Sequence, residues 1–281
     1  MDKQKRVAAI HDISCLGKCS LTVALPVLSA AGIETAVIPT AVLSTHTGGF
    51  ENYSSMDLTA EMPKIIKHWK SLELQFDAVY SGYLGSKEQV DIVCEFLDNF
   101  KSENTLSVVD PAMADNGKMY ALFDSGFAAE TKRLCQKADI IVPNVTEACF
   151  MLDEEYIPSG YDQGFIENMV YRLSDLGPER IVLTGVHFDD KTVSAVAYDR
   201  KAQKMCSVTR DRIDGMFHGT GDVFASALTA ALMNGKDLFR ATEIAVDFTV
   251  GSIKRTIASG AEHYGVDFER GLGEFIKSLE K

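Results

Sequence analysis

The sequence predicts an α/β fold in which a mostly parallel sheet is covered by helices on both faces. Two observations support this prediction. Short runs rich in valine and isoleucine alternate with segments of helical length, and the alternation continues along most of the 281 residues. No low-complexity linker and no internal repeat interrupts it. We therefore expect a single domain that spans residues 1–281.

The expected strands are short and apolar, and they lie at residues 6–10, 35–39, 77–81, 106–110, 138–142 and 180–184. Two further runs, 192–199 and 204–210, flank a polar DRKAQ turn, which predicts a hairpin. The expected helices have apolar residues at helical spacing, and they lie at 19–31, 57–70, 87–100, 144–152, 162–176, 219–234, 237–257 and 268–279. Asp57 is expected to cap the second of these helices.

The composition excludes several classes of protein. Hydrophobic residues make up 46% and charged residues 24%, which is typical of globular proteins and excludes a disordered or fibrous chain. No apolar run approaches the roughly 18–20 residues that span a bilayer. The net charge of −12 disfavours nucleic acid and anionic membranes as partners, because both require a basic surface. An anionic small ligand would have to be held by backbone amides, a helix N-terminus, a metal ion or a few cations.

The N-terminal segment and the cysteines indicate a cytoplasmic protein. The first apolar run is interrupted by His11 and Asp12, so we do not expect a secretory signal. The six cysteines include no C-x-x-C pair, which is typical of free thiols in a reducing compartment.

Polar or glycine-rich loops follow five of the expected strands. They read HDIS at 11–14, SGYLGS at 81–86, DPAMAD at 110–115, PNVTEA at 143–148 and TG at 184–185. In open α/β sheets, ligands bind at the carboxyl ends of the strands. Because these loops should meet at one edge of the sheet, the sequence predicts a ligand site there.

The motif GTGD at 219–222 opens an expected helix. Gly219 and Gly221 allow a sharp turn and place no Cβ near a bound group. Unpaired amides at a helix N-terminus, together with the helix dipole, form an anion site. Asp222 beside such a site suits a general base that deprotonates an attacking hydroxyl. The alternative is an ordinary cap, in which Thr220 or Asp222 binds the helix amides.

Two other stretches carry candidate polar groups. In LSTHTGGF at 43–50, the polar and mobile residues could bind a ring substituent or form a lid, or the stretch is a plain surface loop. Asp110 and Asp115 follow a buried strand and could hold Mg²⁺ directly or through water, although Asp110 could be a turn residue. Glu147 lies three residues after Asn144 and could be a capping residue instead.

The stretch LGKCS at 16–20 is similar to the end of a phosphate-binding P-loop, but the match fails. The pattern G-x-x-x-x-G-K-[ST] requires glycine at position 12 and serine or threonine at position 19. This chain has Asp12 and Cys19 there, so we exclude a P-loop.

Taken together, the chain resembles the ribokinase-like superfamily and, within it, the pyridoxal kinase family, which phosphorylates vitamin B6. The resemblance covers essentially the whole length and rests on HTG at 46–48, SGYLGS at 81–86, DPAMAD at 110–115, ADIIVPNVTEA at 138–148, TG at 184–185 and GTGDVFAS at 219–226. IHDISCLGKCSLTVALP at 10–26 is similar to the bacterial enzymes called pyridoxamine kinases.

The resemblance implies a three-layer ribokinase-like fold and an ATP-dependent kinase. Such a kinase transfers a phosphoryl group to the 5′-hydroxymethyl oxygen of pyridoxal, pyridoxine or pyridoxamine, with ATP and Mg²⁺, and forms a homodimer. The need for a monovalent cation stays open. Asp222 would be the catalytic base, and the anion hole would comprise Gly219, Thr220 and Gly221.

The remaining roles also follow from the resemblance. Asp110 and Glu147 would position Mg²⁺, largely through water. The ATP-binding residues would be Asp115, Asn144 and Thr184, and Tyr120 would lie with Asp115 in a segment that closes near ATP. The vitamin pocket would contain Asp12, Thr47 and Tyr83, with Tyr83 against the pyridine ring.

The substrate stays open at this point. Animal-type pyridoxal kinases carry a neutral polar residue where this chain has Asp12, which could bind a ring hydroxyl or an amine of the substrate. A related branch phosphorylates hydroxymethylpyrimidine, and its motif usually reads GTGC, so Asp222 favours the vitamin B6 branch. A carbohydrate kinase, or a ligand-binding protein that keeps the fold without catalysis, is less favoured.

Overall fold

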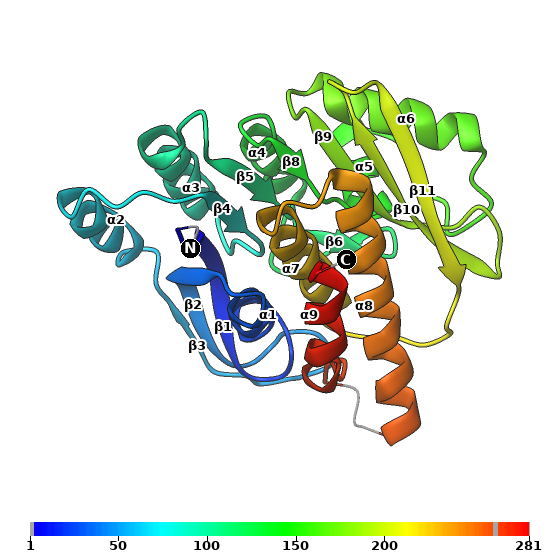
Figure 1. Cartoon of the computed structure of the whole chain (residues 1–281), viewed down its shortest axis with the longest axis horizontal. Coiled ribbons are helices and arrows are strands. Elements are labelled where there is room, and N and C mark those ends of the chain that lie inside the picture. The colour runs from blue at the N-terminus through cyan, green and yellow to red at the C-terminus, as the bar shows by residue number, and fades with distance from the viewer. Residues whose placement is uncertain (1–2, 261–263, 281) are drawn as a thin grey trace.

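The computed structural model of the protein describes residues 3–260 and 264–280, and its core is one mixed sheet (Figure 1). The strands of this sheet are β1 Arg6–Leu16, β2 Glu34–Thr45, β3 Ser55–Asp57, β4 Ala78–Ser81, β5 Leu106–Val109, β8 Ile140–Ile141, β9 Arg180–Val186, β10 Thr192–Asp199 and β11 Lys204–Asp211. They lie in the order β11-β10-β9-β8-β5-β4-β1-β2-β3. A short separate hairpin is formed by β6 Ala114–Asp115 and β7 Lys118–Met119.

The six central strands are parallel, and the antiparallel pairs lie at the edges. The chain leaves β1 for β2 on one side and then crosses to β4 on the other side of β1. The strand order therefore reverses at the carboxyl ends of β1 and β4. In open α/β sheets this is the point where a crevice forms for a ligand.

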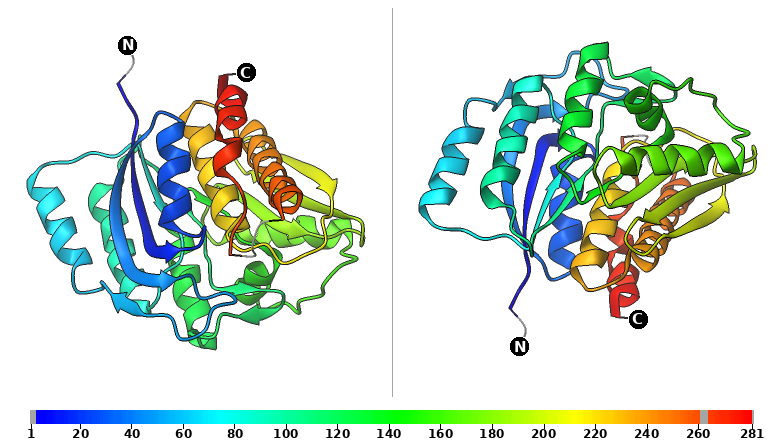
Figure 2. Two further views of the ribbon diagram at one scale, coloured as in Figure 1. Left: turned by 90° about the horizontal axis from the view of Figure 1, so that it is seen from below. Right: turned by 90° about the horizontal axis from the view of Figure 1, so that it is seen from above.

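Helices cover both faces of the sheet, which gives three layers (Figure 2). One face carries α1 Leu21–Ala30, α7 Thr220–Met233, α8 Leu238–Ser259 and α9 Leu272–Glu280. The other face carries α2 Met62–Ser71, α3 Lys87–Phe100, α4 Ser125–Cys135, α5 Val145–Leu152 and α6 Gln163–Asp175. Successive residues of a strand point to opposite faces, so Val7 packs in one core and Ala8 in the other.

Helix α7 is packed deeply between the sheet and its neighbours α1 and α8. Residues 223–231 are all buried, and most of them are alanine, serine, threonine or other small residues that allow close approach. The predicted apolar face of α8 is confirmed, because Leu238, Ala241, Ile244, Ala245 and Phe248 are buried. The rigid packing of α7 fixes the position of its N-terminus.

Two predictions made from the sequence, for residues 11–14 and for Asp57, are wrong. The HDIS stretch is not a loop, because β1 continues past an irregularity at His11 and pairs with β2 as far as Leu16. Asp57 does not cap a helix, because it ends the short edge strand β3 and its carboxylate accepts a hydrogen bond from the Thr59 amide at 2.8 Å. Helix α2 begins later, at Met62.

One helix was not predicted from the sequence, and another begins at a different residue than predicted. Helix α4 was missed, although Asp124 caps it and accepts a hydrogen bond from the Phe127 amide at 3.1 Å. The last helix was placed too early, since residues 269–271 form a 3₁₀ turn before α9. The hairpin of β10 and β11 is confirmed. Within residues 3–260 and 264–280, no helix is both long and apolar enough to cross a bilayer.

Candidate active site

The predicted site residues lie at the carboxyl ends of neighbouring strands. Asp12 lies in the second half of β1, at the irregularity between His11 and Ile13, and Tyr83 follows the neighbouring strand β4. Asp110 follows β5, and Asn144 forms a parallel bridge to Thr184 at the end of β9. The prediction that the strand-end loops converge is confirmed for these positions.

The N-terminus of α7 has amides that no side chain of the described chain caps. The capping position is occupied by Gly219, which has φ 76° and no side chain, and the Thr220 hydroxyl donates instead to the Phe217 carbonyl at 3.1 Å. The alternative of an ordinary side-chain cap is therefore excluded. Open amides and the helix dipole make this end of α7 attractive to an anion.

The glycines of this turn have different roles. A Cβ at Gly219 would lie 1.8 Å from the carbonyl oxygen of Lys18, so the β1–α1 loop and the turn can only meet at glycine. A Cβ at Gly221 would meet open space, which leaves room for a bound group beside the amides.

Asp222 lies in the first turn of α7, next to these amides. The pKa of Asp222 is raised to about 7, chiefly by burial; the nearby Ser20 amide opposes this shift, and the charge of Asp12 adds to it. A carboxyl group with a pKa near neutrality can accept a proton during a reaction and release it afterwards. The geometry and the pKa together suit a general base.

Asp110 and Glu147 form a buried acidic pair beside Asp222. Burial raises the pKa of Asp110 well above its ordinary value, and the charge of Asp222 raises it further. The pKa of Glu147 is also raised, first by burial and then by Asp110. Within the described residues, no lysine or arginine offsets these shifts. The centre therefore lacks the positive charge that three close carboxylates require.

Glu147 and Asn144 form a capping box at the start of α5. The Glu147 carboxylate accepts from the Asn144 amide at 2.8 Å and from the Met113 amide at 3.1 Å, while the Glu147 amide donates to the Asn144 side chain. The Asn144 side chain also donates to the Ala114 carbonyl at 2.8 Å. Glu147 is thus a capping residue, which was the alternative interpretation of its position in the sequence. Both of its carboxylate oxygens accept hydrogen bonds from backbone amides.

These contacts define how a divalent cation fits. The described residues contain no group of three or more histidine, cysteine, aspartate or glutamate side chains arranged as ligands. Asp110 and Glu147 lie close together with excess negative charge, and Mg²⁺ commonly keeps several waters and takes only one or two carboxylates. The pair would therefore suit a hydrated Mg²⁺ that it holds through water molecules.

Asp12 is the buried carboxylate on the other side of Asp222. It is 4% exposed and accepts a hydrogen bond from the Ser14 hydroxyl at 3.3 Å, while burial raises its pKa. Burial raises the pKa of the Tyr83 phenol, and the charge of Asp12 raises it further, which indicates that the two side chains lie near each other. These two predicted pocket residues are brought together.

Tyr83 also faces an aromatic segment that follows β7. Its ring centroid lies 5.5 Å from that of Phe123 and 6.5 Å from that of Tyr120. Burial raises the pKa of the Tyr120 phenol, and the charges of Glu147 and Asp110 raise it further. Tyr120 therefore lies between the acidic pair and Tyr83.

The 46–50 stretch is attached to the site and is not a plain surface loop. His46 is 6% exposed, and its Nε2 lies 3.2 Å from the Tyr264 carbonyl oxygen. Its ring centroid is 5.0 Å from that of His218, and a Cβ at Gly48 would lie 2.7 Å from the His218 ring. Thr47 itself is exposed at the edge of this contact.

Asp115 and Thr184 lie at the margin of the acidic centre. The Asp115 carboxylate accepts hydrogen bonds from the backbone and side chain of Asn116, at 2.8 and 2.9 Å. Burial raises its pKa, and the nearby His218 lowers it. Thr184 pairs through its amide with the Pro143 carbonyl at 2.9 Å.

Three residues of this centre were not predicted from the sequence. His218 precedes the GTGD motif and packs on the 46–50 stretch. Tyr80 is fully buried beneath Asp110 and Asp222, with its hydroxyl 3.4 Å from that of Ser226. Ser20 lies near Asp222, and its amide lowers the pKa of that carboxyl group. Of these, only His218 had a sequence signal, its position next to the glycine motif.

Residues 24–267 match the family described as phosphomethylpyrimidine kinase. The chain belongs to this family. The kinase is similar to a *Bacteroides thetaiotaomicron* protein, provisionally named a phosphomethylpyrimidine kinase, with 39% identity and a TM-score of 0.93 over 100% of this chain and 95% of that one. An orthorhombic crystal form of that protein is described as containing pyridoxal. A pyridoxal kinase from *Lactobacillus plantarum* has 29% identity and a TM-score of 0.89 over 99% of both chains.

Curated relatives divide between two substrates. The kinase is 29% identical to a hydroxymethylpyrimidine/phosphomethylpyrimidine kinase of *Aquifex aeolicus* over 66% of this chain and 71% of that one. It is 27% identical to a pyridoxine/pyridoxal/pyridoxamine kinase of *Bordetella avium* over 91% and 87%. It is also 28% identical to a thiamine biosynthetic bifunctional enzyme of *Arabidopsis thaliana* over 80% of this chain, but spans only 42% of that enzyme.

These comparisons confirm the predicted ribokinase-like fold and the resemblance to pyridoxal kinases. The protein is a kinase of the pyridoxal and hydroxymethylpyrimidine kinase group.

We expect Gly219→Ala to disrupt the turn, because alanine would combine a left-handed backbone with a Cβ 1.8 Å from the Lys18 carbonyl. The backbone term alone costs roughly 1–2 kcal/mol. Urea denaturation should show a lower midpoint and activity should be lost. The matched control is Gly221→Ala, whose Cβ meets open space, so the midpoint should be retained. A wild-type midpoint for Gly219→Ala would contradict the close contact.

Proposed function

We propose that this kinase uses ATP to phosphorylate the 5′-hydroxymethyl group of a vitamin B6 vitamer. The observation that carries the proposal is the position of Asp222. It lies beside the open amides of α7, with the acidic pair on one side and Asp12 on the other. A proton acceptor located between an anion site and a polar pocket is the arrangement that transfer of a phosphoryl group to an alcohol requires.

The proposed reaction is an in-line transfer. Asp222 takes the proton of the substrate hydroxyl, whose oxygen attacks the γ-phosphorus of ATP, and ADP leaves. The amides of 219–222 would stabilise the charge on the transferred group. A Mg²⁺ ion, when bound through water at Asp110 and Glu147, supplies further positive charge to the phosphates. Asp115, Asn144 and Thr184 are proposed to contact ATP at the margin of this centre.

The vitamer pocket is proposed at Asp12, Thr47 and Tyr83. The pyridoxal in crystals of the *Bacteroides* relative supports a pyridine substrate. A buried carboxylate at position 12 favours a substrate that presents a hydrogen-bond donor or a positive charge, such as a ring hydroxyl or the amine of pyridoxamine.

Hydroxymethylpyrimidine is the second candidate substrate. The family description and the *Aquifex* relative favour it. The same centre would deprotonate its hydroxymethyl group, so only the ring pocket distinguishes the two substrates. The aspartate of GTGD, where the pyrimidine branch usually has cysteine, favours the vitamers.

The direct test is an assay of pyridoxal, pyridoxine, pyridoxamine and hydroxymethylpyrimidine with ATP and Mg²⁺. We expect kcat/KM for at least one vitamer to exceed that for the pyrimidine alcohol by tenfold or more. Phosphate ester formation is followed by mass spectrometry and ADP release. Turnover of the pyrimidine alone would overturn the vitamer proposal, and turnover of neither would favour a protein without catalysis.

We expect Asp222→Ala to lower kcat by roughly 10²–10⁴-fold, because the proton acceptor is lost. Binding of ATP and of the vitamer, measured by calorimetry, should stay within a few-fold of wild type. The matched control is Asp237→Ala, which removes an aspartate from the start of α8, far from this reaction. A normal kcat for Asp222→Ala would show that another group takes the proton.

The raised pKa values predict that metal binding releases protons. Burial and mutual repulsion raise the pKa values of Asp110 and Glu147, so the pair holds its protons to higher pH than ordinary carboxyl groups do, whereas a divalent cation favours the ionised forms. Calorimetric titration with pre-formed Mg²⁺–ADP in two buffers of different ionisation enthalpy should show net proton release, smaller at pH 9. Asp110→Asn should reduce the release. Identical enthalpies in both buffers would contradict this interpretation.

A further inference from the structure

Gln89 is a buried polar side chain near the start of α3. It is 1% exposed, although glutamine usually lies at the surface. Ser86 caps this helix, and its hydroxyl accepts from the Gln89 amide at 3.2 Å. In an S-x-x-Q pattern the glutamine side chain commonly binds the amide of the capping residue. Here it accepts from the amide of Gly85, one residue earlier, at 2.7 Å, so its hydrogen bonds extend beyond its own helix.

Both groups of the Gln89 carboxamide have partners. The oxygen accepts from the Gly85 amide, while the nitrogen donates to the Thr40 carbonyl at 3.0 Å and to the Thr59 hydroxyl at 2.9 Å. The nitrogen also donates to the Asp57 carboxylate at 3.4 Å. A backbone amide can only donate, whereas a carbonyl or a carboxylate can only accept, so these partners require a glutamine in this orientation.

The carboxamide oxygen holds the loop that carries Tyr83. A Cβ at Gly85 would lie 4.0 Å from the Tyr83 ring and 3.7 Å from the Gln89 oxygen, so the ring and the carboxamide flank the same peptide. At the start of this loop, the Gly82 amide donates to the Ile10 carbonyl at 3.2 Å. The backbone of Tyr83 therefore lies between two hydrogen-bonded positions, one on β1 and one on Gln89.

The carboxamide nitrogen binds β2 at an irregularity of the sheet. The ladder between β1 and β2 skips a residue here, between the pairs His11–Pro39 and Ile13–Val42. Asp12 on β1 therefore lies opposite two residues of β2, Thr40 and Ala41, which is the pattern of a β-bulge. The Thr40 carbonyl accepts from the Gln89 side chain and from the Leu58 amide, both at 3.0 Å. Gln89 thus binds the backbone of the bulge that faces Asp12.

We propose that Gln89 is a positioning residue for the substrate pocket, because its carboxamide joins the loop that carries Tyr83 to the bulge of β2 opposite Asp12. Since β1 lies between β4 and β2, this connection spans the point where the strand order reverses. It keeps the two pocket residues at a fixed separation. The inference rests on the proposed pocket and function, and it holds for a vitamer or a pyrimidine alcohol alike.

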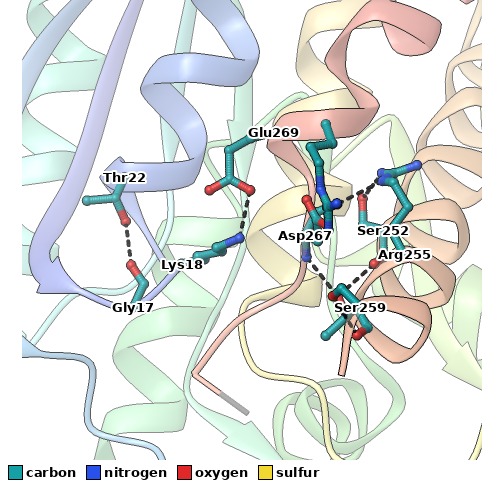
Figure 3. Close-up of polar contacts among 10 residues, drawn as sticks. Gly17, Lys18, Thr22, Ser252, Arg255, Ser259, Asp267 and Glu269 are labelled. Atoms are coloured by element: carbon teal, nitrogen blue, oxygen red, sulfur yellow. Dashed lines mark hydrogen bonds and ion pairs between the residues drawn. The ribbon is translucent and has the colours of Figure 1, made fainter. Parts of the chain in front are cut away.

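The loop on the phosphate side of the site is held by a different set of contacts (Figure 3). Lys18 pairs with Glu269 at 2.7 Å, as Figure 3 shows, and its amide donates to the Tyr264 carbonyl at 3.1 Å. Arg255 on α8 holds the same segment by donating to the Asp267 carbonyl at 2.9 Å. These contacts come from α8 and from the chain after residue 264.

The two sets of contacts lie on opposite faces of the sheet. Helix α3 packs in one core, whereas α8 and α9 pack in the other. The contact between the Lys18 carbonyl and Gly219 depends on the second set. Loss of the Gln89 carboxamide should therefore alter the pocket for the alcohol and leave the anion site at α7 in place.

The first test is Gln89→Met, which keeps the length and the apolar part of the side chain but loses its hydrogen bonds. The KM for the alcohol that wild type turns over fastest should rise about tenfold, because the Gly85 amide and the Thr40 carbonyl lose a buried partner and the pocket shifts. We expect kcat to fall by less than about threefold and the KM for ATP to stay within about twofold of wild type.

The matched control is Asp162→Ala, which removes the cap of α6, where the Asp162 carboxylate accepts from the Gly164 amide at 2.6 Å. We expect it to lower the melting temperature by roughly 2–4 °C and to leave both KM values unchanged. If Gln89 served stability alone, Gln89→Met would behave like this control. A lower melting temperature with an unchanged KM for the alcohol would therefore overturn the proposal.

A second variant, Gln89→Glu, tests the hydrogen bond to the bulge. An ionised carboxylate still accepts from the Gly85 amide, but it cannot donate to the Thr40 carbonyl and it lies beside the Asp57 carboxylate. Burial and Asp57 should raise the pKa of the introduced carboxyl group, which when protonated donates as the carboxamide does.

The measured quantity is the KM of Gln89→Glu for the alcohol, divided by that of wild type at the same pH. We expect this ratio to be about tenfold at about pH 8 and to fall below about threefold at about pH 6, whereas the ratio for Gln89→Met should not change with pH. A ratio for Gln89→Glu that stays at the higher value at the lower pH would contradict the role of the donor to Thr40.

Failure of the proposed function would give a different result, because wild type would then phosphorylate none of the alcohols. The Kd of pyridoxal, measured by calorimetry, replaces KM in that case. An affinity about tenfold weaker in Gln89→Met than in wild type would support the role of Gln89 without turnover, and equal affinities would overturn it. If wild type bound neither pyridoxal nor hydroxymethylpyrimidine, the pocket itself would be wrong and the inference would fall with it.

Discussion

The contact on which the site depends is the one between the Lys18 carbonyl and Gly219. It brings a loop from the start of the chain against the turn before α7, at a distance that only glycine permits. This contact sets the loop before α1 against the N-terminus of α7, next to Asp222. A side chain at position 219 would separate the two elements.

The second constraint is electrostatic. Asp12, Asp110, Glu147 and Asp222 are gathered at the end of a sheet in a protein of net charge −12. Burial and mutual repulsion make their ionised forms unfavourable in the ligand-free state. The acidic centre therefore favours the binding of a cation. The N-terminus of α7, with its positive end of the helix dipole, favours an anion beside it. We therefore expect the metal ion and the anionic nucleotide to bind more strongly together than either binds alone.

Much of this arrangement could be predicted from the sequence. The alternation of apolar strands and helices predicts the sheet, and the strand-end loops predict where Asp110, Asn144 and Thr184 meet, because parallel strands end at one edge. What could not be predicted depends on contacts between distant segments. Nothing local distinguishes Ser20 from an ordinary helix cap, and the edge strand that displaced the Asp57 cap is three exposed residues long. LGKCS was excluded as a P-loop, yet it borders the same anion site through its backbone.

The attachment of the Lys18 loop to residues near the end of the chain has a consequence for synthesis. The Tyr264 carbonyl accepts from the Lys18 amide and lies 3.2 Å from His46, so one peptide group contacts both loops that border the site. The sheet and the core that it forms with α2 to α6 can assemble from residues that emerge earlier from the ribosome. The geometry of the catalytic centre is completed only after the last tenth of the polypeptide has been made, so a nascent chain passes through a sheet-containing stage without a finished centre.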